Sequence, residues 1–298
     1  MSDLTNVFTD IADAIRAKTQ TQITYKPTEM ASAINNIETG GGAVEITKGQ
    51  LNSSFNSPVI IPNGITNIFG CFSGFTNFNQ PVTIPDSVIG MGSCFSSCYN
   101  FNQPVNIPNG VVYASFCFAG CYNFNQSVNI PNSITNMQSF FKDCNKFNQP
   151  VTISNSATTI SACFQQCKNF NQPVNIPSRV TNMAFCFQNC HNFNQPVNIP
   201  NSVVHIGRCF HDCTAFASII RVACNPSLNV FGLLQNTAQS KVRTIITDNT
   251  SKFLVTNTQS IVGASIIWTQ DGDNYYNTAY NIYINYSADP FNEPDPVF

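Results

Sequence analysis

The chain has 298 residues, with 13 Lys and Arg, 15 Asp and Glu, and a net charge of −2 at pH 7. Only 9% of the residues are charged, which argues against a surface of clustered Lys and Arg that displaces counterions from nucleic acid. No apolar run approaches the roughly 18–20 residues of a membrane span. We therefore expect no nucleic-acid partner, no membrane insertion, and a surface rich in amides and hydroxyls.

The first region, residues 1–42, has a helical pattern. Apolar residues recur at helical spacing from Leu4 to Ile15, and Pro27 opens a second helix that the glycines at 40–42 end. Two helices this short are not stable alone, so the region predicts an attachment or oligomerisation segment followed by a glycine linker. A homotrimer or another homo-oligomer is one such arrangement.

The N-terminus lacks the basic start, apolar core and cleavage site of a secretory signal. The chain also has 13 cysteines, an odd number. Together these features predict synthesis in a reducing bacterial cytoplasm with mostly free thiols.

The second region, residues 43–216, repeats the 23-residue unit FNQPVxIPxSVxxMxxCFxxCxN. In each unit PVxIP alternates as a short strand does, with Val82 and Ile84 on one side and Thr83 on the other. The CFxxC segment predicts a turn or a single helical turn. The repeated phenylalanine that opens each unit occurs at Phe55, Phe78, Phe101, Phe124, Phe147, Phe170, Phe193 and Phe216.

A unit of this length cannot bury its own apolar face, but stacked units can. The predicted fold is therefore a mainly β repeat solenoid with 23-residue rungs, in which equivalent side chains form columns. The period fades in residues 217–298, where alternating and tyrosine-rich stretches predict a β-rich C-terminal cap or binding region.

The repeats resemble a known family. The segment IPNSVVHIGRCFHDC and its sister copies look like BspA-like leucine-rich repeats, and the FNQP and VTNM segments resemble related repeats of mycoplasma and gut-bacterial surface proteins. The likeness covers about residues 55–215, with Phe and Cys where the family usually has Leu and Ala. It implies a leucine-rich-repeat-like, ligand-binding scaffold and transfers no catalytic residue.

A second resemblance covers about residues 6–42. The segment IADAIRAKTQTQITYKPTEMASAINNIETGGG is similar to a leader of tail, fibre and other virion proteins of phages that infect Gram-positive bacteria. This resemblance implies that residues 1–42 bind other virion proteins and that the protein is located in a virion.

The cysteines permit three interpretations. CxxxC pairs repeated along a ladder do not converge on one tetrahedron, as zinc requires, and Phe140 and Phe75 interrupt the two columns with side chains that bind no metal. We expect buried apolar thiols rather than metal ligands, and leave cross-rung disulfides as the lesser alternative. The first column is Cys71, Cys94, Cys117, Cys163, Cys186 and Cys209, and the second is Cys98, Cys121, Cys144, Cys167, Cys190 and Cys213.

Two amide columns begin at Asn79 and Gln80 and recur in each of the six good units, which run from Phe78 to Ala215 and match the repeat closely. Stacked amides can satisfy backbone groups of the turns rung after rung, or they can form a sugar-binding surface. Identity in every rung favours the structural role, more strongly for Asn than for Gln.

Positions that vary between rungs are candidates for ligand binding, although variation also fits drift on a solvated face. The candidate ligand-facing residues are Tyr113, Asn136, Thr159, Asn182 and His205 in one column, Tyr99, Tyr122, Lys168 and His191 in a second, and Trp268, Tyr275, Tyr276 and Tyr280 near the C-terminus.

Catalysis has little support in the sequence. The carboxylates of the six good units, Asp86, Asp143 and Asp212, lie in different rungs, whereas a glycosidase needs two facing acids. We assign no catalytic, cofactor-binding or metal-binding residue. The sequence thus predicts a non-enzymatic phage virion protein, of the tail-fibre or receptor-binding type, that binds a host-surface glycan or protein. The alternatives are a virion decoration or assembly protein, a BspA-like bacterial adhesin, and a depolymerase.

Overall fold

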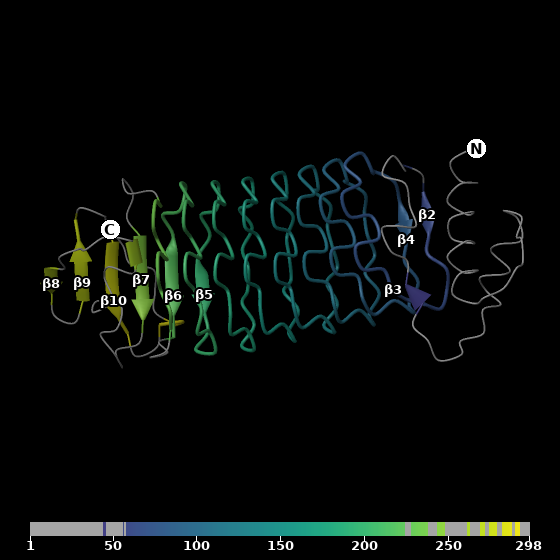
Figure 1. The fold of residues 1–298 in the computed structure, drawn as a ribbon. Coiled ribbons are helices and arrows are strands. Elements are labelled where there is room, and N and C mark those ends of the chain that lie inside the picture. The colour runs from purple at the N-terminus through teal and green to yellow at the C-terminus, as the bar shows by residue number, and fades with distance from the viewer. Residues whose placement is uncertain are drawn as a thin grey trace, which may run out of the picture.

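The computed structural model describes residues 44–45, 56, 58–223, 228–237, 243–247, 261–262, 269–271, 274–278, 282–287 and 290–292. The helices predicted within residues 1–42 lie outside this part of the chain. The described repeats stack as successive rungs in one row, with β2–β4 at one end and β5–β10 at the other (Figure 1). The predicted mainly β repeat solenoid is therefore what the structure shows.

Rungs pair in parallel, and through most of the solenoid the paired residues are 23 positions apart. Val59 pairs with Val82 and Asn67 with Gly90. Between the named strands, the middle rungs keep this pairing through isolated parallel bridges. The strands of the first rungs are β1 (Val44–Glu45), which pairs with β3 (Ile65–Asn67), and β2 (Val59–Ile60), which pairs with β4 (Val82–Thr83).

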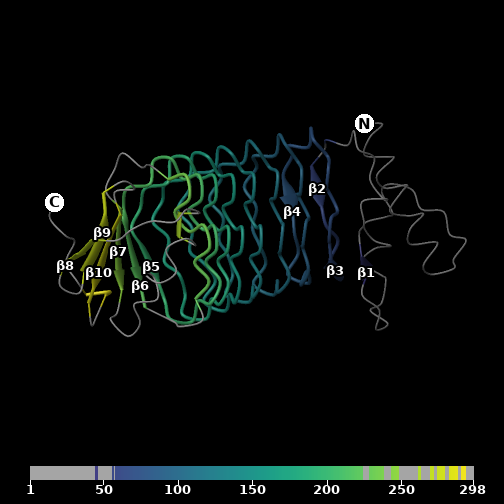
Figure 2. The same ribbon diagram turned by 60° about the vertical axis from the view of Figure 1, so that its left-hand side comes forward.

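The C-terminal end carries a six-stranded sheet in the order β5-β6-β7-β10-β9-β8. Its first four strands are parallel, and β9 and β8 complete it as antiparallel strands, so the row of rungs passes into this sheet (Figure 2). Parallel pairing thus runs past residue 216, and the boundary there remains a prediction. The strands are β5 (Val197–Ile199), β6 (Ile219–Val222), β7 (Arg243–Thr247), β8 (Thr269–Asp271), β9 (Asn274–Asn277) and β10 (Ile282–Tyr286).

The CFxxC segment forms consecutive turns, not a helical turn. The N–H groups of Cys94 and Cys98 donate to the carbonyls of Met91 and Phe95, closing two four-residue turns. Their third residues, Ser93 and Ser97, have φ of 54° and 60°, as a type II turn requires. Alternate N–H groups bond to the next rung instead. This alternation turns the chain sharply while every rung remains hydrogen-bonded to its neighbour.

The core contains two columns of stacked phenylalanines. Phe95 stacks at 4.5 Å on Phe101, which opens the next unit, and on Phe72 and Phe118 of the adjacent rungs, both at 5.4 Å. Such offset stacks contribute roughly 0.5–1.5 kcal/mol each beyond the burial of their area. Because the rings of the inner rungs have partners in the rungs before and after them, the core is continuous along the solenoid.

The thiols lie in the same core. All twelve cysteines of the described residues are free and buried, as the sequence predicts. Burial raises the pKa of Cys71, Cys163 and Cys209 from 9.0 to about 12. Phe75 and Phe140, which interrupt the cysteine columns, are also buried. The cysteine positions are thus apolar pockets that accept either a thiol or a ring.

The asparagine column has the structural role that the sequence favours. Oδ1 of Asn79 accepts the backbone N–H of Asn102 at 2.9 Å and the side-chain amide of Gln103 at 3.2 Å. The pattern repeats in the following rungs and ends where Asn194 accepts the N–H of Ala217 at 2.7 Å. The amides therefore tie each turn to the next.

Candidate binding face

The first variable column forms a straight row on the backbone. Each member is joined to the next by a parallel β-bridge, so its side chains lie about 4.8 Å apart. Tyr113 is 65% exposed, His205 is exposed, and Asn136, Thr159 and Asn182 are half-buried. We call this set the ladder row. Its members are Asn67, Gly90, Tyr113, Asn136, Thr159, Asn182, His205 and Asn229.

Five of the ladder-row side chains also stabilise the backbone: Oγ1 of Thr159 accepts the N–H of Ser161 at 3.3 Å, and four asparagines act in the same way. Oδ1 of Asn67, Asn136, Asn182 and Asn229 accepts the N–H two residues later at 2.8–3.0 Å. Asparagine commonly caps a turn in this way. The residue type at each position of this row therefore partly reflects which side chain closes the turn. Tyr113 and His205 are the candidates least involved in this structural role.

The second variable column holds a tyrosine pair. Tyr99 and Tyr122, 38% and 41% exposed, stack at 4.6 Å across neighbouring rungs. Partial burial and the neighbouring Tyr99 raise the pKa of Tyr122. Lys168 and His191 follow as exposed residues two and three rungs after Tyr122. The second variable column thus has two aromatic side chains in its earlier rungs and basic side chains in its later rungs.

The C-terminal candidates do not form one exposed cluster. Tyr275 is only 8% exposed and belongs to the core, because alternate residues of β9 face opposite sides. Tyr276 is half-buried and stacks on Tyr283 at 5.9 Å. Trp268 and Tyr280 lie outside the described residues. Tyr276 is therefore the candidate of this group with a described, partly exposed ring.

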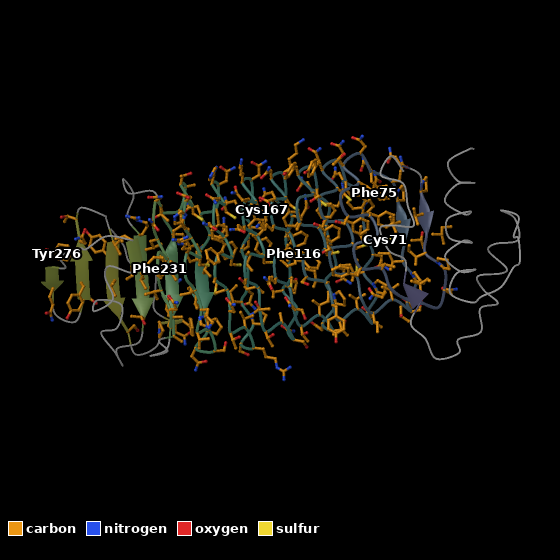
Figure 3. All side chains as sticks on the ribbon, viewed as in Figure 1. Cys71, Phe75, Phe116, Cys167, Phe231 and Tyr276 are labelled. Carbon is orange, nitrogen blue, oxygen red and sulfur yellow. The ribbon has the colours of Figure 1, made fainter. Side chains whose placement is uncertain are left out.

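Sequence reasoning missed four exposed phenylalanines. Phe69 and Phe231 are 60% and 50% exposed, and Phe116 and Phe185 are both 36% exposed. Phe116 lies among the middle rungs and Phe231 nearer the C-terminal end (Figure 3). Each occupies a column that has a small residue (Gly, Ser or Ala) or a polar residue in most rungs. That departure from the column was the available signal, hidden by the many core phenylalanines.

The described residues contain no group of three or more His, Cys, Asp and Glu side chains that could hold a metal ion. Nδ1 of His211 lies 2.8 Å from Oδ2 of Asp212, but the adjacent Cys213 is buried and its pKa is raised well above 9.0. A thiol held in its neutral form is a weak nucleophile. This run therefore gives no nucleophile–base pair.

These features define a parallel repeat solenoid with an aromatic and thiol core and with rows of variable residues on its surface. A family model described as "Mycoplasma protein of unknown function, DUF285" matches residues 61–153 and 115–223, which together exceed half of the chain. The chain belongs to this family. The match confirms the predicted resemblance to mycoplasma repeats, whereas the resemblance of residues 6–42 to a phage leader stays a prediction.

The chain is also similar to two solved structures. One is a leucine-rich repeat protein from Bacteroides ovatus, with 19% identity, a TM-score of 0.47, and coverage of 71% of this chain and 68% of that one. The other is a leucine rich cell surface protein from Faecalibacterium prausnitzii, with 16% identity, a TM-score of 0.35, and coverage of 71% and 64%. No curated protein matches the sequence. Among the described residues, none of the helices has the length and apolar character to cross a membrane.

Proposed function

We propose that the protein is a non-catalytic binding scaffold of the surface-adhesin kind, which holds a host-surface glycan or protein against its ladder row. The observation that carries this proposal is the unbroken bridge pattern of that row. It sets side chains of different chemistry at a fixed spacing on a rigid backbone, and rigid elements position binding groups more closely than loops do.

The composition of the surface supports a neutral or weakly polar ligand. The chain has 9% charged residues, and its exposed aromatic rings lie beside amides and hydroxyls. Aromatic faces pack against the apolar faces of sugar rings, and amides bond hydroxyl groups. Contiguous exposed apolar patches commonly mark an interaction site.

We favour the adhesin role over the virion role because the two roles are supported by different parts of the chain. The binding row lies in described residues of the matched family, and the repeats resemble those of bacterial surface proteins. The virion role rests on residues 6–42, which the described part does not include. That resemblance still makes a virion receptor-binding or decoration protein the second candidate, with residues 1–42 as the segment that binds other virion proteins or copies of this chain.

Two experiments test the proposal. The full-length chain is screened against mammalian and bacterial glycans, extracellular-matrix proteins and whole cells. We expect binding that Tyr113→Ala combined with His205→Ala weakens. Asn129→Ala combined with Asn175→Ala should leave it unchanged; both residues belong to the exposed strand row, the position between Val and Ile in each PVxIP segment. Binding that both double variants retain would remove the ladder row from the proposal. Immunogold labelling then separates the two candidates, since it places the protein either on a cell envelope or on a virion.

A further inference from the structure

In the N-terminal half of the solenoid, the described surface has a neutral, aromatic area that spans three successive rungs. Its rings are Phe69, Tyr113 and Phe116, and the rung between them has glycine at both outward positions, Gly90 and Gly92. We call these five residues the aromatic patch. We infer that the aromatic patch is a binding site for a neutral oligosaccharide, an inference that rests on the proposed binding function and names its ligand class.

The glycines allow the patch to form. A Cβ at Gly92 would lie 3.0 Å from Cδ2 and 3.1 Å from Cε2 of Phe69, so the ring lies directly against this glycine. The N–H of Phe69 donates to Oδ1 of Asn67 at 2.9 Å, which fixes the residue that carries the ring. A side chain at Gly92 would displace the ring, and Gln138 shows that a large side chain otherwise fits this column.

The rings remain open to solvent despite this packing. Phe69 is 60% exposed and Tyr113 65% exposed, although burying such rings would be favourable. They lie two rungs apart, about 10 Å, so a ligand that touches both is longer than a single sugar ring. Ser115 and the exposed Gln138 flank them with a hydroxyl and an amide. Apolar faces bordered by a few polar groups are typical of ligand sites.

The distribution of charged residues on this face distinguishes a neutral glycan from an acidic one as the ligand of the aromatic patch. No residue in 66–70, 89–93 or 112–116 is charged. At the other end of the same face, His205 lies in the ladder row and the guanidinium of Arg208 lies 5.4 Å from the ring centre of Phe231. An acidic glycan would gain from that end and not from the aromatic patch.

The backbone argues against an added peptide strand. Strand addition needs free N–H and C=O groups at an open edge. Within the patch the N–H of Gly90 bonds to the carbonyl of Thr66, and its carbonyl accepts the N–H of Ile68. The ligand must therefore be held by side-chain surfaces, which favours a sugar over an extended peptide.

The test uses the full-length chain and soluble neutral oligosaccharides of glucose, galactose, mannose and the N-acetylhexosamines, with affinity measured by calorimetry. We expect at least one to bind, and Phe69→Ala or Tyr113→Ala to weaken that binding by about tenfold or more. Gly92→Gln should weaken it as well, because it displaces the Phe69 ring; its φ is not in the left-handed region, so the backbone accepts the change.

Phe116 and Phe185 supply a matched control. They occupy the same column three rungs apart, are both 36% exposed, and have φ of 59° and 60°. Phe116→Ser should weaken binding and Phe185→Ser should not, and serine occupies this column at Ser93 and Ser139. Cooperative unfolding of each variant shows that it is folded.

Three outcomes would overturn the inference. If Phe69→Ala with Tyr113→Ala retains full affinity for a neutral oligosaccharide, the sugar site lies elsewhere and the proposed binding function stands. If the chain binds only acidic glycans or proteins, the ligand class is wrong and the binding function again stands. If it binds no glycan, protein or cell, both proposals fail together.

Discussion

The thiol of Cys98 donates a hydrogen bond to the backbone carbonyl of Phe72 across 2.9 Å, from one rung to the preceding one. The same bond recurs in every later rung of the second cysteine column, at 2.9–3.1 Å. The cysteine is therefore more than a small apolar side chain, because it gives a second hydrogen bond to a buried carbonyl that already accepts the N–H of Phe75 at 3.0 Å. Alanine would fill part of the pocket but could not donate.

Removing one of these donors should destabilise the fold. Cys144→Ala deletes the bond to the carbonyl of Phe118 and leaves a small cavity, so we expect the free energy of unfolding to fall by about 1–3 kcal/mol. Denaturant unfolding measures the change. Lys146→Ala, at an exposed position of the next turn, is the control and should have little effect. Equal stability of the two variants would show that the thiol bond contributes nothing.

The buried thiols should make stability fall at alkaline pH. The folded-state pKa of Cys71, Cys163 and Cys209 is about 12, whereas a thiol of the unfolded chain has a pKa near 8.5. Above that pH the unfolded state binds fewer protons than the folded state, so the free energy of unfolding decreases as pH rises. The loss is about 1.4 kcal/mol per pH unit for each such thiol, until pH reaches the folded-state pKa.

Urea unfolding under reducing conditions from neutral pH to about pH 10 measures this slope. The stabilisation should be complete below the unfolded-state pKa, and Cys163→Ala should give a shallower alkaline slope than the unaltered chain. A stability that stays flat over this range would mean that the thiols are not shielded from water.

A substitution in the asparagine column should lower the free energy of unfolding more than a substitution of an exposed asparagine. Oδ1 of Asn148 accepts the N–H of Asn171 at 2.9 Å and the side-chain amide of Gln172 at 3.3 Å. We expect Asn148→Ala to cost about 1–3 kcal/mol, because it leaves a part-buried N–H without its acceptor. Asn175→Ala, on the exposed strand row, should change stability by less than about 0.5 kcal/mol. Similar losses at both positions would contradict a structural ladder.

Two neighbouring glutamines test the turn geometry. Gln166 has φ of 65° and Gln165 does not have a positive φ; both are half-buried. A β-branched residue at positive φ is strained, so Gln166→Val should lower stability by about 1–3 kcal/mol more than Gln165→Val. Gln166→Gly should be tolerated, since Gly74 and Gly120 occupy this column with positive φ. Thermal unfolding of the three variants compares them, and equal losses for the two valine variants would refute the turn assignment.

Much of the fold could be predicted because the sequence repeats. The 23-residue period requires equivalent environments, so one buried Phe95 or Cys98 implies its counterparts in the other rungs. The alternation of Val82, Thr83 and Ile84 correctly indicated one buried and one exposed face. The turns of the CFxxC segment were harder to predict, because CFxxC has helical spacing and the residues with left-handed backbone at these turns are mostly not glycine.

The binding surface was harder to predict. The sequence identified the variable column, including Tyr113 and His205, but not that several of its asparagines close turns. Phe69 was not distinguished from the core phenylalanines, although its column is otherwise small or polar, because its exposure depends on how the turn directs its side chain. The contribution of Gly92 is equally conformational, since it becomes clear only from the ring that lies against it.

The most direct test of the account is thiol labelling of the native protein, read out by mass spectrometry at each cysteine. If the rungs stack around a dry core, the twelve buried thiols, such as Cys98 and Cys186, should resist a soluble alkylating reagent under native conditions and react fully in denaturant. Native labelling of these positions at the rate of the denatured chain would contradict the stacked core and every surface argument built on it.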